Sequence, residues 1–103
     1  MTAYLVVDIE IHDLQRYETY KRMAPPSIAL YGGRYLTRGG ETEVLEGDWT
    51  PKRFVILEFP TMDQARAWWS SPEYAEAKAL RQAIATTRMV LTEGLPLGMP
   101  QPA

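Results

Sequence analysis

The stretch Tyr31-Gly-Gly-Arg-Tyr-Leu-Thr-Arg-Gly-Gly40 places five residues between two glycine pairs. Glycine adopts backbone angles that a Cβ forbids, so Gly32-Gly33 can end a helix and Gly39-Gly40 can turn a strand back. The residues between the two pairs are therefore predicted to form a short strand. This stretch indicates a fold, and it carries no signal for a reaction.

Alternation of apolar residues predicts further strands on both sides of this stretch. Ala3 to Ile11 has the period of two that is typical of a strand with one wholly apolar face. Arg53 to Phe59 is apolar on both faces, as expected for a central strand. Thr42 to Leu45 is predicted to pair nearby as a ribbon, and Thr87 to Glu93 to form the last strand.

Capping residues mark the predicted helices. Asp13 can cap a helix that reaches Tyr31, and Pro25-Pro26 predicts a kink in it or two abutting helices. Thr61 and Gln64 form a capping box for a second helix through Trp69. A third helix is predicted to start at Ser71-Pro72 and to carry one face made of Tyr74, Ala77, Arg81 and Ile84.

The order of these elements predicts an α+β fold, a ferredoxin-like βαββαβ sandwich over residues 1–94, followed by a Pro/Gly-rich tail over residues 95–103 that is extended or disordered. We expect strands 3–11 and 53–59 to be central, parallel neighbours. Helices should cover one sheet face, and the other would expose an apolar patch. A homodimer with sheet-to-sheet contact, in which Val55 and Leu57 take part, is therefore predicted.

Composition excludes several classes of protein. A net charge of −2 with scattered cations gives no basic surface for phosphates, so no nucleic-acid partner is expected. The chain has no cysteine, which excludes disulfides and thiolate sites. No stretch approaches membrane-spanning length and no signal peptide is evident, so we expect a cytoplasmic protein without a membrane partner.

Several segments together resemble the DUF1330 family, a family of unknown function. They are residues 31–40, Val44-Leu-Glu-Gly-Asp-Trp49, Glu58-Phe-Pro60, Ala67-Trp-Trp-Ser-Ser-Pro-Glu-Tyr74 and Arg81. The resemblance covers nearly all of the chain up to Glu93. It implies a dimeric α/β barrel of two ferredoxin-like protomers, and no established reaction. Similar barrels include antibiotic-biosynthesis monooxygenases, muconolactone isomerases and heme-degrading enzymes, but a shared fold does not transfer a function.

Metal and cofactor sites are not predicted. His12 is the only histidine, and it stands beside Asp13 at a strand-to-helix turn, where a surface role is expected. Many members of the family carry histidine where this chain has Tyr31, so the resemblance implies no histidine chemistry there. Acid-base work would have to come from tyrosine, carboxylates or arginine.

Two carboxylates interrupt the apolar central strands. Burial would raise the pKa of Asp8 and Glu58 unless an arginine pairs with them. The candidates are Arg34, Arg38 and Arg53, and the even spacing of Arg34 and Arg38 predicts that they share one strand face. These groups form either a pocket for an anionic or carbonyl-bearing molecule or a set of structural ion pairs.

The predicted ligand site lies in the cleft between sheet and helices and contains Tyr31, Arg38, Glu58, Trp68 and Tyr74. Adjacent Trp68 and Trp69 diverge by about 100° on a helix, so one should pack inside and the other edge a pocket or interface. Core or interface packing explains these aromatics without any ligand. The predicted function is binding of a small metabolite, and the alternatives are a cofactor-independent monooxygenase- or isomerase-like enzyme and a non-catalytic dimeric module.

Overall fold

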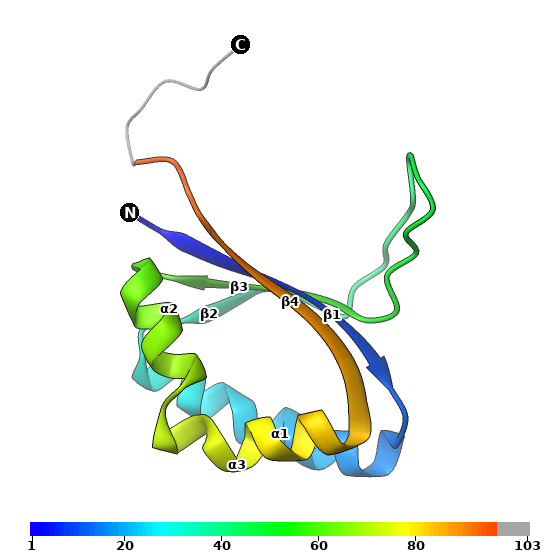
Figure 1. Cartoon of the computed structure of the whole chain (residues 1–103), viewed down its shortest axis with the longest axis horizontal. Helices are drawn as coiled ribbons and strands as arrows, with labels where there is room; N and C mark the ends of the chain where they lie inside the picture. Colours follow the sequence, from blue (N-terminus) through cyan, green and yellow to red (C-terminus); the bar gives the residue numbers. More distant parts are fainter. Residues whose placement is uncertain (97–103) are drawn as a thin grey trace.

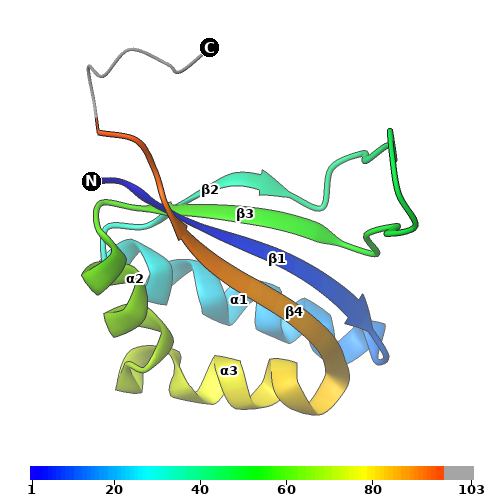
Figure 2. The same ribbon diagram turned by 45° about the horizontal axis from the view of Figure 1, so that its top comes forward.

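The computed structural model describes residues 1–96, which form one four-stranded sheet with three helices on one of its faces (Figures 1 and 2). The elements are β1 (Ala3–Ile11), α1 (Leu14–Leu30), β2 (Arg34–Arg38), β3 (Phe54–Phe59), α2 (Met62–Trp69), α3 (Pro72–Ile84) and β4 (Ala85–Glu93). This arrangement confirms the predicted ferredoxin-like α+β fold. Most of the predicted tail lies outside the described residues. No helix within residues 1–96 is long and apolar enough to cross a membrane.

The strand order is β2-β3-β1-β4, and every neighbouring pair is antiparallel. The expectation that strands 3–11 and 53–59 run parallel is therefore wrong. The crossover through α1 leaves β1 and β2 pointing the same way, and β3 reverses direction after β2. Because β3 lies between these two strands, it is antiparallel to both.

The hydrophobic core lies between the sheet and the helices. Val55 and Leu57 of β3 are paired in register with Val7 and Leu5 of β1, and all four side chains are buried on the helix side. The prediction that Val55 and Leu57 meet a partner sheet is therefore wrong. The opposite set of β3 side chains, which includes Phe54 and Ile56, faces away from the helices.

Helix α1 is continuous through Pro25 and Pro26, so the predicted pair of abutting helices is not formed. As predicted, the Asp13 side chain caps the helix by accepting a hydrogen bond from the Arg16 amide. Pro25 has no N–H, so the carbonyl of Lys21 loses its normal helical donor. A side chain outside the helix can bond to this carbonyl instead.

The caps predicted for α2 and α3 are confirmed. The Thr61 hydroxyl accepts from the Gln64 amide at 3.1 Å, and the Ser71 hydroxyl accepts from the Tyr74 amide at 3.1 Å. The predicted inner face of α3 is buried throughout, with Arg81 only 4% exposed. An arginine is thereby placed in the core between the helices.

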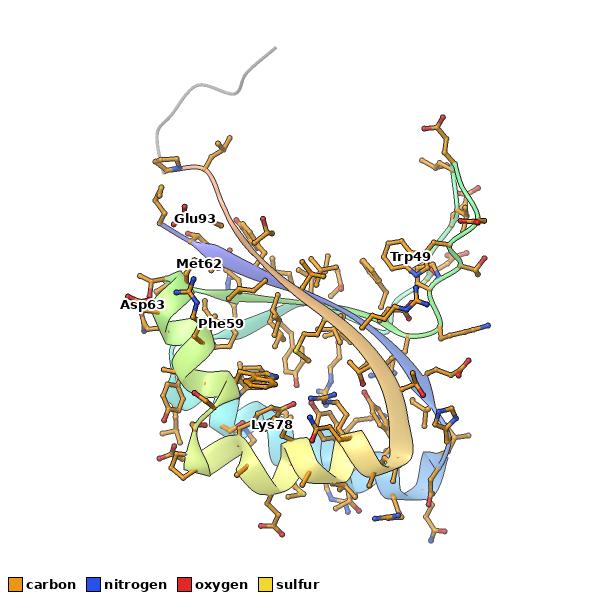
Figure 3. The ribbon with its side chains drawn as sticks, in the orientation of Figure 1. Trp49, Phe59, Met62, Asp63, Lys78 and Glu93 are labelled. Atoms are coloured by element: carbon orange, nitrogen blue, oxygen red, sulfur yellow. The ribbon has the colours of Figure 1, made fainter. Side chains whose placement is uncertain are left out.

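Residues 39–53 form a loop that rises beyond the sheet on the side away from the helices (Figures 1 and 2). The predicted strand pairing of Thr42 to Leu45 is wrong, because Gly39 turns the chain out of the sheet with a φ of +71°. Trp49 returns toward the sheet on that same side (Figure 3). Its indole Nε1 donates to the Asp8 carboxylate at 2.8 Å.

Candidate functional site

A cavity of about 30 Å³ lies between the sheet and α1. This volume admits about two water molecules. Its inner wall is apolar and includes Trp68, and its polar wall combines tyrosines with cations. The polar lining residues are Tyr17, Tyr20, Lys21, Tyr35, Arg38 and Arg53.

Arg38 reaches this cavity because β2 contains an irregularity. The register shifts between Tyr35 and Thr37, so that Arg38 pairs with Val55 and shares the helix side of the sheet. The Arg38 guanidinium lies 4.7 Å from the centroid of the Tyr35 ring, and its Nη2 donates to the Lys21 carbonyl at 2.8 Å. This is the carbonyl freed by Pro25, so a proline inside α1 helps to position a cation at the cavity.

Arg53 approaches the same cavity from the start of β3. Its guanidinium lies 5.4 Å from the centroid of the Tyr17 ring, and its Nε is buried without a hydrogen-bond partner within the described part of the chain. The backbone of Gly39 passes so close that a Cβ there would stand 2.5 Å from the Arg53 Nη1. Glycine at position 39 is thus needed both for its positive φ and for the space that Arg53 occupies.

The end of the cavity where Arg38 is exposed and Arg53 is half-buried is here called the mouth, and it carries positive charge without a carboxylate partner. Among residues 1–96, no carboxylate lies within 4.0 Å of Arg38 or Arg53, whereas Lys21 is paired with Glu18 at 3.1 Å. Burial raises the pKa of the phenols of Tyr17, Tyr20 and Tyr35, so these side chains are neutral at physiological pH. Two guanidinium groups without a carboxylate partner, beside neutral phenols, favour an anion as ligand.

Behind the cavity wall lies a buried polar chain. The Arg81 Nε donates to the Tyr74 hydroxyl at 3.2 Å, and the Tyr74 and Tyr20 hydroxyls are 2.7 Å apart. The Trp68 ring stacks on Tyr74 with centroids 4.0 Å apart, and its Nε1 donates to the Ser27 hydroxyl at 3.0 Å. These bonds fix the inner end of the cavity.

The five predicted site residues do not share one cleft. Arg38 and Trp68 line the cavity, and Tyr74, which is fully buried, lies behind Trp68. Tyr31 caps α1 elsewhere and donates to the Glu73 carboxylate at 2.7 Å, a bond that raises the pKa of Tyr31 and lowers that of Glu73. Trp69 is 44% exposed, which confirms that the two adjacent tryptophans diverge.

The two strand carboxylates face the open side of the sheet. Glu58 accepts a hydrogen bond from the Arg34 Nε at 2.8 Å, which confirms the structural ion-pair alternative for this residue. Since Arg34 pairs with Glu58 and Arg38 lies across the register shift, the prediction that the two arginines share a face is wrong.

Asp8 pairs with none of the three candidate arginines. Partial burial alone would raise the pKa of Asp8, but hydrogen bonds from Trp49 and from the Lys52 amide outweigh it and lower that pKa.

The site predicted from the sequence does not include Tyr17, Tyr20, Tyr35 or Arg81, and it considers Arg53 only as a candidate partner of Asp8 and Glu58. A signal existed for Arg81, because it stands on an otherwise apolar helix face. Arg53 also has the odd numbering of the buried β3 side chains. Nothing in the sequence indicates that Tyr35 and Arg38 share a face, since the bulge decides it.

No three histidine or carboxylate side chains of the described ranges come close enough to hold a metal ion. His12 is a surface turn residue, as predicted, with its side chain 54% exposed. Its Nε2 lies 2.8 Å from the Thr86 hydroxyl. The polar groups at the cavity are therefore arginines, a lysine and phenols, which suit an anion rather than a cation.

Several solved structures have a fold similar to that of this chain. A protein of unknown function from Rhodopseudomonas palustris has a similar structure, with a TM-score of 0.76, 20% identity, and coverage of 92% of this chain and 83% of its own. SnoaB, a cofactor-independent oxygenase from Streptomyces nogalater, is similar with a TM-score of 0.64 and 15% identity, over 95% of this chain and 98% of its own. A dimeric ferredoxin-like protein of unknown function from Jannaschia sp. CCS1 has a TM-score of 0.63 and 14% identity, over 91% and 100% of the two chains.

At these identities the similarity shows the fold alone. No curated protein matches the sequence. The model of one family does match it, over residues 2–95, which takes in every strand and helix of the sandwich and all the residues that line the cavity. The chain belongs to DUF1330, a family defined by a domain of unknown function.

Proposed function

We propose that the protein binds a small organic anion in the cavity between the sheet and α1, with Arg38 and Arg53 holding the anionic end. The observation that carries this proposal is the presence of two guanidinium groups at the mouth with no carboxylate within 4.0 Å among the described residues. A guanidinium offers paired N–H donors that match a planar carboxylate. Within the cavity, Trp68 and the tyrosines supply the apolar and aromatic walls that are typical of small-molecule sites.

Of the five residues predicted from the sequence, the proposal keeps Arg38 and Trp68 as ligand contacts and Tyr74 as the support behind them. Tyr31 and Glu58 lie outside the cavity. The size of the cavity limits the part of the ligand that enters to a few atoms, while the charged end stays at the mouth.

Butyrate is a suitable probe, because it joins one carboxylate to a short apolar chain. Its binding is measured by NMR titration, observing the indole N–H of Trp68. Arg38→Gln and Arg53→Gln should each weaken binding by about tenfold to a hundredfold, since a charge-assisted hydrogen bond contributes roughly 1.5–3 kcal/mol. Arg34→Gln is the matched control, because its guanidinium pairs with Glu58 on the other sheet face. Absence of any saturable shift of the Trp68 signal would overturn the proposal.

We also propose that two protomers pair through the open sheet face. That face carries apolar side chains from three strands, which are Tyr4, Val6, Phe54, Ile56 and Val90. Val90 is 63% exposed, and the loop beside the face exposes Leu45 to 86%. Such a patch favours association, and the dimeric relative from Jannaschia supports it. Light scattering should give twice the chain mass of 11.7 kDa, and a single-chain mass at high micromolar concentration would contradict the pairing.

A further inference from the structure

A chain of three hydrogen-bonded groups runs from Arg81 in the core through Tyr74 to Tyr20 in the cavity wall. Arg81 is 4% exposed and has no carboxylate within 4.0 Å in the described part of the protein. Its Nε donates to the hydroxyl of Tyr74, which in turn lies 2.7 Å from the hydroxyl of Tyr20. Burying a cation without a carboxylate partner costs free energy, so the polar groups around Arg81 must offset that cost with hydrogen bonds.

The direction of this chain follows from the number of donors and acceptors. The Tyr74 oxygen accepts from Arg81, and Tyr74 is fully buried with its ring stacked on Trp68. The Tyr74 hydroxyl hydrogen has one available acceptor among residues 1–96, the oxygen of Tyr20. If Tyr20 donated to Tyr74 instead, the hydrogen of Tyr74 would be buried without an acceptor, at a cost of about 1–3 kcal/mol. Tyr74 is fully buried, whereas Tyr20 lines the cavity, where water or a ligand can accept its hydrogen. The favoured direction of the bond is therefore from Tyr74 to Tyr20.

This direction leaves the hydroxyl hydrogen of Tyr20 without an acceptor in the described structure. Tyr20, unlike Tyr74 and Arg81, lines the cavity. The lining of the cavity thus includes a phenol with an unused hydroxyl hydrogen, and its oxygen is polarised by Tyr74 and by the positive charge of Arg81. Successive hydrogen bonds of one direction strengthen one another, and a low-dielectric interior adds to the effect.

We propose that Tyr20 donates a hydrogen bond to a neutral oxygen of the ligand at the inner end of the cavity. This inference rests on the proposed anion binding and narrows the ligand class to small acids that carry a second oxygen acceptor, such as a ketone carbonyl. Arg38 and Arg53 hold the carboxylate at the mouth, and Tyr20 receives the carbonyl. A cavity of about 30 Å³ has room for a carbonyl group with little beyond it.

Acetoacetate and butyrate test this proposal, because the two anions share a carboxylate and a four-carbon chain and differ by one ketone oxygen. In NMR titrations of the whole protein, acetoacetate should bind about tenfold more tightly than butyrate, the ratio that one satisfied donor provides. Tyr20→Phe should remove this preference, so that the variant binds acetoacetate and butyrate equally. Tyr31→Phe is the matched control, because it removes a phenol that lies outside the cavity and bonds to Glu73, and it should keep the tenfold preference.

The outcomes separate this proposal from the proposed function. Equal binding of the two anions by the wild-type protein would overturn the role of Tyr20 and leave anion binding in place. Binding of neither anion would overturn both. If Tyr20→Phe does not fold, as judged by circular dichroism, Tyr74→Phe replaces it. That variant keeps the Tyr20 hydroxyl and loses its polarising partner, so its preference for acetoacetate should decrease, and an unchanged preference would overturn the proposal.

Discussion

The two faces of the sheet differ in what their side chains meet. On the helix side, β1 contributes Leu5, Val7 and Ile9, each at most 5% exposed. On the open side, the same strand contributes Tyr4, Val6 and Asp8, which are partly exposed, and Asp8 is bonded to the loop at residues 39–53. The core therefore depends on one face, and the other is free to take part in association. Substitutions on the two faces should accordingly have effects of different kinds.

The largest effect is expected from a charge on the helix side. Val55→Asp places an unpaired carboxylate in the core, which costs roughly 3–5 kcal/mol or more, against a total stability of about 5–15 kcal/mol for a domain. Loss of the cooperative thermal transition in circular dichroism is the expected result. Val90→Asp is the matched change on the open face, where the side chain is 63% exposed. It should keep the folded spectrum and reduce the mass in light scattering to that of one chain.

An intermediate effect is expected where the chain passes from the cavity to the open-side loop. Gly39→Ala forces a Cβ onto a residue with φ of +71° and against the Arg53 guanidinium. A left-handed conformation costs about 1–2 kcal/mol for a residue other than glycine, and the shift of Arg53 should also weaken butyrate binding. Gly40→Ala is the control, because a Cβ there meets nothing within 4 Å. Equal results for the two variants in urea unfolding and in NMR titration would contradict this account.

The sequence predicted the fold more fully than the site. Alternation in β1 and the caps of three helices define the sandwich, and these are local signals. The face of β3 that forms the core could also have been assigned. The apolar set of β1 is the one with odd numbers, and antiparallel registration of Leu5 with Leu57 places Val55 and Leu57 beside it. When β1 and β3 are expected to run parallel, this register is not available, and Val55 and Leu57 cannot be assigned to the core.

The cavity depends on features that no local pattern records. The bulge in β2 brings Arg38 to the helix side, and Pro25 frees the carbonyl that holds it there. Tyr20, Tyr74 and Arg81 come from two helices that meet only after folding. An arginine on an apolar helix face is visible in the sequence, but its partners are not. The sequence also does not show which side of the sheet Glu58 faces. It therefore predicts Glu58 in the site, whereas the structure places this residue on the other side of the sheet.

The smallest effect concerns Asp8, which anchors the loop to the open face. Its carboxylate accepts from the Trp49 indole and from the Lys52 amide, and its pKa is below the usual value of 3.8. A carboxylate whose pKa is lower in the folded state stabilises the protein above the unfolded-state pKa, and this contribution is lost as the pH falls through the folded-state value. At neutral pH, Asp8→Asn should lower the free energy of unfolding by less than about 1 kcal/mol, because one amide oxygen cannot replace two charged acceptors and solvent screens the site.

Urea unfolding at fixed protein concentration measures this difference. The gap between the wild-type protein and Asp8→Asn should be constant near neutral pH and should narrow as the pH is lowered below 3.8, because the wild-type carboxylate then becomes protonated. Glu10→Gln is the control on the same strand, since the Glu10 side chain is exposed and has no hydrogen bond to the loop at residues 39–53 within the described residues. A gap that stayed constant down to pH 2 would mean that the loop is held by the Trp49 ring against Phe54, whose centroids are 5.8 Å apart, and not by the charge of Asp8.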